Sequence, residues 1–228
     1  MINKRLVGSL LSAGLLLSIL AAVANKHSEE LDQVCAEMDQ LIGENKTDAK
    51  TEETLQKDMA ILDTLSVSDI RRLRAKVAMV RFYAKTKNAE RGAKAQAQLT
   101  KYMNEFISSS NLPDSVLTRG AVECDNLADI FVVRFYPFRG RDVKGKADAR
   151  DFAVAEGLRL QALALYDRLP ANNSVRLDAH RNIVFWYRHY GHDTAAKAQT
   201  DILAKLIGSN EPEKLFPAPP PCPACGMG

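Results

Sequence analysis

Two cysteines near the carboxyl terminus have the spacing of a metal or redox site. Cys222 and Cys225 lie in the proline-rich stretch that ends the chain, and its prolines favour an extended conformation that would hold the pair away from the folded body. A closed zinc site needs four ligands, so zinc here would take two more from a second copy or a partner. The pair could instead exchange disulfides or form a small inert disulfide.

A basic and aromatic cluster near the middle of the chain is the second candidate site. Loops of this composition can bind phosphate, nucleic acid or lipid headgroups. Aspartates flank the cluster, and an exported protein is not expected to meet nucleic acid, so we expect either a solvated loop between repeats or a contact surface for a protein. The partner-binding candidates are Arg134, Phe138, Arg139, Arg141 and Lys144.

The other two cysteines are far apart in the sequence. Four cysteines allow three pairings, and with Cys222 and Cys225 paired, Cys35 and Cys124 could form a disulfide between the N-terminal helix and the middle of the chain. Such a bridge would suit an oxidising compartment. The alternative is two separate buried thiols.

Sequence motifs of catalysis are missing. The chain has no phosphate-binding glycine loop, no Gly-x-Ser-x-Gly elbow, no His-Glu-x-x-His zinc helix and no calcium loop. His189 and His192 are close in sequence, but Gly191 between them is expected to end a helix, so we expect solvated histidines there. We therefore expect a protein that is not an enzyme.

The first 24 residues have the composition of an export signal. Lys4 and Arg5 form a short basic region, residues 6–24 are uncharged and mostly apolar, and Ala22-Val23-Ala24 matches a cleavage site. The competing interpretation is an uncleaved membrane anchor, because the apolar run is near the lower limit for spanning a bilayer. In either case the rest of the chain is expected outside the cytoplasm: periplasmic or secreted after cleavage, or anchored in the inner membrane and facing the periplasm.

Three stretches of the chain resemble one another. Phe82-Tyr83, Phe135-Tyr136 and Trp186-Tyr187 each follow an alanine by seven residues. The outer two copies match further, since Asp63 and Arg72 of the first correspond to Asp167 and Arg176 of the last. Such self-similarity is typical of arrays in which each helical unit buries its apolar face against its neighbours. We expect the aromatic pairs to pack in the core.

Apolar residues recur every three or four positions, which predicts helices and almost no sheet. Residues 25–51 are expected to form one helix and a loop at 44–51, and residues 52–210 a helical-repeat domain of three repeats. Within it, helices are predicted at about 52–65, 115–136 and 194–207, and Ser68 and Ser174 are predicted to cap two others. Residues 211–228 are predicted to be a proline-rich tail.

Residues 52–207 resemble the tetratricopeptide-like family of helical-hairpin repeats. In each copy a first helix ends in leucine before a turn, and a second helix carries alanine, an aromatic pair and a polar turn. Longer helices would account for a spacing of 51 to 53 residues, against about 34 in that family. The resemblance implies an all-α fold of antiparallel hairpins, stacked as a short right-handed solenoid with a curved surface for a protein or peptide.

The formal charge of +3 falls to +1 without the two basic residues of the leader, which favours neither nucleic acid nor an anionic membrane as a partner. The sequence thus predicts an exported, nonenzymatic scaffold or adaptor that binds a protein partner in the cell envelope, such as a secretion or pilus assembly. It predicts no cofactor and no membrane contact beyond residues 1–24. The alternative is a metal-binding or thiol-redox accessory protein that acts through Cys222 and Cys225, with zinc between two copies as one form.

Overall fold

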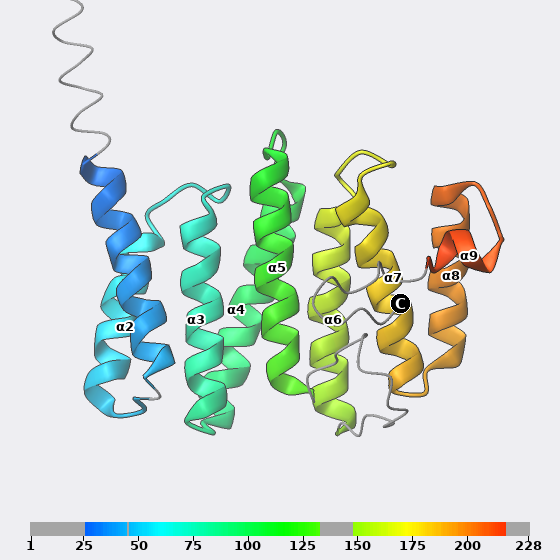
Figure 1. Cartoon of the computed structure of the whole chain (residues 1–228). Coiled ribbons are helices and arrows are strands. Elements are labelled where there is room, and N and C mark those ends of the chain that lie inside the picture. The colour runs from blue at the N-terminus through cyan, green and yellow to red at the C-terminus, as the bar shows by residue number, and fades with distance from the viewer. Residues whose placement is uncertain (1–25, 45, 133–147, 218–228) are drawn as a thin grey trace, which may run out of the picture. The chain divides into compact units, whose positions relative to one another are not determined.

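The computed structural model of the chain describes residues 26–44, 46–132 and 148–217 (Figure 1). Throughout these ranges the regular elements are helices and no strand occurs, which confirms the predicted all-α class. The chain divides into two compact units between Leu99 and Thr100. An N-terminal helix at 26–43 is followed by α2 (Ala49–Leu62), α3 (Ile70–Lys85), α4 (Ala89–Ser108), α5 (Asp114–Phe131), α6 (Ala149–Tyr166), α7 (Ser174–His189), α8 (Asp193–Ile207) and α9 (Pro212–Leu215).

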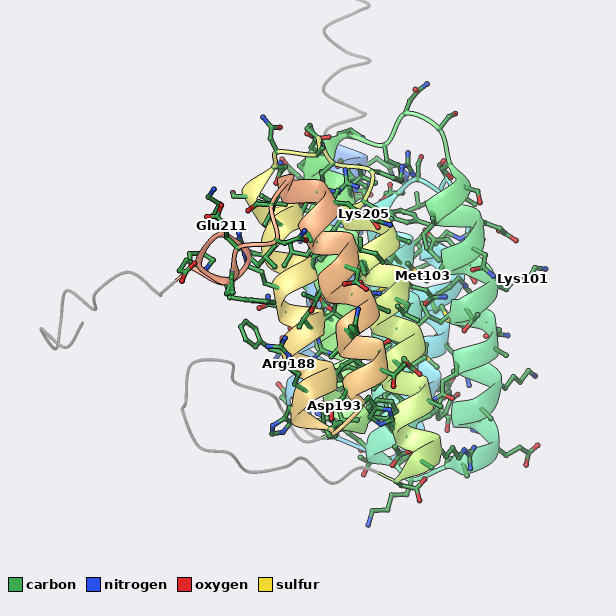
Figure 2. All side chains as sticks on the ribbon, turned by 90° about the vertical axis from the view of Figure 1, so that its right-hand side faces the viewer. Lys101, Met103, Arg188, Asp193, Lys205 and Glu211 are labelled. Carbon is green, nitrogen blue, oxygen red and sulfur yellow. The ribbon has the colours of Figure 1, made fainter. Side chains whose placement is uncertain are left out.

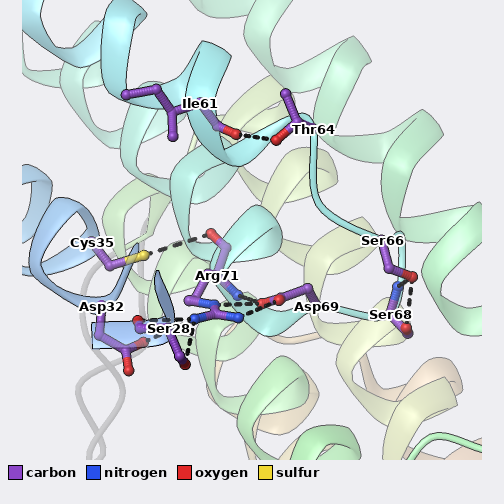
Figure 3. Close-up of polar contacts among 9 residues, drawn as sticks. All are labelled: Ser28, Asp32, Cys35, Ile61, Thr64, Ser66, Ser68, Asp69 and Arg71. Carbon is purple, nitrogen blue, oxygen red and sulfur yellow. Dashed lines mark hydrogen bonds and ion pairs between the residues drawn. The ribbon is translucent and has the colours of Figure 1, made fainter. Parts of the chain in front are cut away.

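In the first unit, Arg71 at the start of α3 forms hydrogen bonds that connect α3 to the N-terminal helix. Its Nη1 donates to the main-chain oxygen of Ser28 at 3.3 Å and to the Ser28 hydroxyl at 3.1 Å. Its Nε and Nη2 donate to the two carboxylate oxygens of Asp69 at 2.9 and 2.7 Å (Figure 3). One guanidinium therefore joins the cap of α3 to the helix packed beside it.

Two further contacts continue along the same pair of helices. Arg74 pairs with Asp39, and the Lys85 ammonium donates to the carbonyl oxygen of Ile42 at 2.5 Å. The contacts progress in the same direction on both helices, so the N-terminal helix runs parallel to α3.

Helix α2 begins earlier than the sequence pattern predicted. The Asp48 carboxylate accepts the Thr51 N–H at 2.8 Å and caps the helix, so the predicted loop at 44–51 ends at Asp48 and the predicted helix at 52–65 is wrong by three residues at each end. The first turn of α2 is polar and has no apolar periodicity. For this reason the sequence pattern predicted a start that is too late.

Both predicted serine caps are wrong by one residue. Asp69 caps α3, since its Oδ1 accepts the Arg71 N–H at 2.9 Å. Asn173 caps α7, since its Oδ1 accepts the Val175 N–H at 2.9 Å. In each pair both neighbours have side chains suited to capping, and the one whose backbone is extended just before the first helical turn takes the role.

The predicted helix at 115–136 ends at Phe131. Val132 already has an extended backbone, with φ −128° and ψ 157°, and Val132-Val133 is a β-branched pair that disfavours helix. Residues 133–147, which include the middle aromatic pair Phe135-Tyr136, lie outside the described residues.

Part of the predicted tail at 211–228 is packed structure. Pro212–Leu215 forms the short helix α9, and Leu215 is buried against Leu203 and Ala204 of α8. Arg181 of α7 donates from Nε to the Leu215 carbonyl at 2.8 Å. The extended-tail prediction is therefore wrong for 212–215, where a leucine supplies an apolar anchor.

The outer two sequence copies share their three-dimensional contacts. We call α2, α3 and the start of α4 the first copy, and α6, α7 and α8 the second copy; corresponding residues are 104 positions apart. Arg72 donates to Asp63 and to the Leu65 carbonyl, both at 3.1 Å. In the second copy Arg176 donates to Asp167 at 3.1 Å and to the Leu169 carbonyl at 3.0 Å. Arg72 and Arg176 are therefore equivalent residues, and each makes the same two contacts across the hairpin turn of its own copy.

Two more features repeat with the same offset. The Tyr83 hydroxyl donates to Glu52 at 2.8 Å, and the Tyr187 hydroxyl donates to Glu156 at 2.8 Å. The second helix of each copy is followed by a left-handed residue, Lys87 with φ 53° and Gly191 with φ 76°. Gly191 thus has the helix-ending role predicted for it, at no steric cost.

Candidate functional site

The structure leaves the two main sequence-predicted sites undescribed. Cys222 and Cys225 lie in 218–228, and the partner-binding candidates Arg134, Phe138, Arg139, Arg141 and Lys144 lie in 133–147; both ranges are outside the described residues. The leader at 1–24 is outside them too. These assignments stay predictions.

Cys35 and Cys124 are buried free thiols, as in the alternative of two separate thiols, and the predicted disulfide is not formed in this structure. Cys35 lies 4.0 Å from the Arg71 carbonyl oxygen (Figure 3), and Cys124 lies 3.7 Å from the Met103 sulfur. Burial raises the pKa of Cys35 to about 11 and raises that of Cys124 as well. Both are therefore protonated and weakly reactive near neutral pH.

The described residues contain neither a metal-ligand cluster nor a membrane-spanning helix, and they do not include Cys222, Cys225 or residues 1–24. Across the described residues, no three histidine, cysteine or acidic side chains gather as metal ligands. None of the helices in that part of the chain combines the length and the apolar character needed to cross a bilayer.

The second unit contains a groove with a polar lining. Helix α6 packs against both α5 and α7, and lies between them in Figure 1. A cavity of about 50 Å³ lies in the groove, and the residues around the cavity come from all three helices. They are Asp125 of α5; Arg159, Leu163 and Tyr166 of α6; and Ala179, Asn182 and Ile183 of α7.

Arg159 bridges two aspartates across this groove. Its Nη2 donates to Asp129 at 2.6 Å and its Nη1 lies 3.4 Å from Asp125. The two carboxylates come from one face of α5, because residues four apart on a helix are neighbours. Only 12% of the Arg159 side chain is exposed, and its buried Nε has no hydrogen-bond partner among the described residues.

A stack of rings holds the other side of the guanidinium. Arg159 lies over the Trp186 ring at 5.3 Å, and Trp186 stacks on Phe152 with centroids 4.7 Å apart. Phe152 in turn stacks on His192 at 4.1 Å with an interplanar angle of 6°. Cation–π attraction and ring packing thus fix the arginine in position. The prediction that His192 is merely solvated is incomplete, since one face of its ring is covered.

Asp125 and Tyr166 are the titratable groups of the cavity, besides Arg159, and burial shifts the pKa of both. Burial raises the pKa of Asp125 to about 6; the Arg159 cation opposes this rise and Asp129 adds to it. The Asp125 side chain keeps 35% of its surface accessible, so water still reaches the carboxyl and moderates the shift. Tyr166 is 6% exposed, and its hydroxyl makes no hydrogen bond within the described residues. Burial and the nearby Asp125 raise its pKa, which keeps the hydroxyl protonated.

The first copy lacks this polar site. Leu55 stands where the second copy has Arg159, Leu62 where it has Tyr166, and Ala78 where it has Asn182. All three first-copy residues are buried and apolar. The hairpin therefore folds without polar residues at these positions, and their presence in the second copy needs another explanation.

A second hollow lies between the end of α8 and α9, and it is wide and shallow. Its rim carries Asp201, Lys205 and Glu211, and Figure 2 shows Lys205 and Glu211 projecting from the chain. No buried polar group points into it, so the groove on α6 is the better candidate site.

Sequence reasoning missed the groove. Asp125 and Asp129 have a helical four-residue spacing, and Arg159 is the one charged residue in the run Gly-Leu-Arg-Leu-Gln-Ala-Leu-Ala-Leu-Tyr. A lone arginine in an apolar run could have been the signal, but the sequence did not say which residues would face it.

Comparison of the chain with protein-family models, with curated proteins and with solved structures finds no match. The class of the protein therefore rests on its own geometry: an all-α chain of repeated helical hairpins, with a polar groove in its second unit.

Proposed function

We propose that this protein is an exported helical-repeat adaptor that binds a protein partner in the cell envelope through the groove on α6. Its hairpins would stack as a short right-handed solenoid of the tetratricopeptide-like kind. The observation that supports binding most directly is the polar groove, which the second copy has and the equivalent first copy lacks. Repeat scaffolds commonly keep their hairpin contacts constant and vary the residues of a binding face.

The export part of the proposal rests on the sequence of residues 1–24. An envelope partner, such as a component of a secretion or pilus assembly, follows from that compartment alone.

Photo-crosslinking tests the adaptor proposal. A photoreactive amino acid is placed at Asn182, which is exposed at the groove, and in a control at Lys197 of α8, whose side chain is 78% exposed. In cells of the native host we expect one defined protein adduct from position 182 and none from position 197. Equal adducts from both positions, or none from 182, would contradict binding through the groove.

The alternative function, metal or thiol chemistry at Cys222 and Cys225, is tested in the same cells. The adduct from position 182 should persist when both cysteines are replaced by serine. If the adduct is lost and the zinc content of the protein also falls, the function depends on the cysteine pair.

A further inference from the structure

The charges in the groove leave one carboxylate weakly paired. Asp129 has a close contact with Arg159 at 2.6 Å, whereas Asp125 lies 3.4 Å from the same guanidinium. Burial raises the pKa of Asp125, the Arg159 cation opposes this rise, and the neighbouring Asp129 adds to it. The site would accept one more positive charge.

The cavity also offers hydrogen-bond acceptors beside that carboxylate. Tyr166 lines the cavity and is 6% exposed as a residue, and its hydroxyl has no hydrogen-bond partner among the described residues. Asn182 contributes an amide at the exposed edge. An ammonium group has three donors and no acceptor, so it could donate to the Asp125 carboxylate and to the Tyr166 oxygen.

The number of acceptors selects among cations. Asp125 and the Tyr166 oxygen offer few acceptors in the cavity. A compact ammonium carries three donors, whereas a planar guanidinium carries five and would leave more of them unpaired. Leu163 and Ile183 form an apolar wall against which the methylene stem of a lysine can pack.

From these observations we propose that the α6 groove binds a lysine side chain of the partner protein, with its ammonium between Asp125 and Tyr166. The inference rests on the adaptor function proposed above and names the chemistry of its partner. The first copy acts as an internal comparison, since Leu55, Leu62 and Ala78 would offer an ammonium no acceptor.

The test uses n-butylammonium as a probe on the full chain, followed by NMR of side-chain carboxyl carbons. We expect a saturable decrease in the pKa of Asp125, because the bound cation stabilises the carboxylate. Asp58 is the matched control, because it is a buried carboxyl of the first copy whose pKa is also raised by burial. Its pKa should not respond to the probe.

Two variants locate the binding. Binding of n-butylammonium is followed by NMR at the Asn182 side-chain amide. Asp125→Asn should weaken this binding by about tenfold or more, and Tyr166→Phe should weaken it by a smaller factor. Tyr166→Phe removes a hydroxyl without a partner and should leave thermal stability unchanged or increased. n-Butylguanidinium should bind more weakly than n-butylammonium.

The results separate this inference from the adaptor function. Equal shifts at Asp125 and Asp58, or tighter binding of the guanidinium, would overturn the lysine site. If the position-182 adduct forms equally in wild-type and Asp125→Asn protein, the adaptor function stands and the lysine site falls. If the ammonium binds as expected and no adduct forms, the cation site stands and the adaptor function falls.

Discussion

Arg159 is a buried cation at a position where an equivalent hairpin of the same chain has a leucine. Burying a charge is costly unless it is paired and hydrogen-bonded. Asp129, Asp125 and the Trp186 ring offset that cost, yet the Nε proton is left without a partner in the described structure. Leu55 shows that the hairpin does not need this arrangement for folding. We therefore expect Arg159 to serve the groove rather than the stability of the hairpin.

Asp125 should give the protein a characteristic pH dependence. Burial raises its pKa to about 6 in the folded chain, above the 3.8 of an ordinary aspartate, so between about pH 4 and 6 the folded state binds more protons than the unfolded state. The free energy of unfolding then falls as the pH rises through that window. Urea unfolding at a series of pH values should show this slope in the wild type and a smaller one in Asp125→Asn.

Asp201→Asn is the control for that experiment, because Asp201 lies on the surface of α8 and pairs with Lys197. Its pH profile should follow that of the wild type. Identical slopes for wild type and Asp125→Asn would show that Asp125 titrates like an ordinary aspartate.

Cys35 and Cys124 should react slowly with thiol reagents. The thiolate is the reactive form, and burial raises the pKa of Cys35 to about 11. In a chain with Cys222 and Cys225 replaced by serine, we expect slow alkylation at pH 8 and the addition of two labels once the protein is unfolded in urea. If mass spectrometry of the unfolded, unreduced protein shows no label, the Cys35 to Cys124 disulfide predicted from the sequence has formed instead.

At the scale of the helix, capping distinguishes two adjacent polar residues. Asn173 accepts N–H groups of the first turn of α7, whereas the side chain of Ser174, the first helical residue, makes no such contact in the structure. Asn173→Ala should lower the free energy of unfolding by about 1 kcal/mol. Ser174→Ala is the matched control and should change it by less than about 0.5 kcal/mol. Chemical denaturation measures both, and a larger loss for Ser174→Ala would contradict the observed cap.

Arg72 and Arg176 stabilise the hairpin turns of the two copies by the same contacts. Arg72 and Arg176 each hold the carboxylate before a turn and a carbonyl within it. Both contacts span fewer than ten residues, so they can form while the hairpin itself forms. The repeated sequence pattern is thus explained by a repeated local contact rather than by a shared ligand.

At the scale of the whole chain, the two compact units should differ in their response to core substitutions. Leu73 of α3 and Leu165 of α6 are both fully buried, and replacement of either by alanine should cost about 2–5 kcal/mol. Hydrogen exchange of the full chain should then accelerate mainly at 26–99 for Leu73→Ala and mainly at 100–217 for Leu165→Ala. Uniform acceleration by both variants would mean that the two units unfold as one.

The sequence alone determined the helices and the outer two copies, for a physical reason. A helix is stabilised by contacts between residues three or four apart, and a hairpin by contacts across a short turn, so both leave periodic marks in the chain. Exact starts escaped this reasoning at Asp48, Asp69 and Asn173, because neighbouring residues had equally suitable side chains or no apolar period.

Only the tertiary structure decided where the groove lies. Asp125, Arg159 and Asn182 come from three successive helices, and no spacing in the sequence connects them. Their meeting depends on how α5 and α7 pack against α6. The apolar periodicity that predicts each helix determines which face is buried, but the partner of each buried polar group depends on the rotation of one helix against the next. That rotation is determined by side-chain packing across the interface.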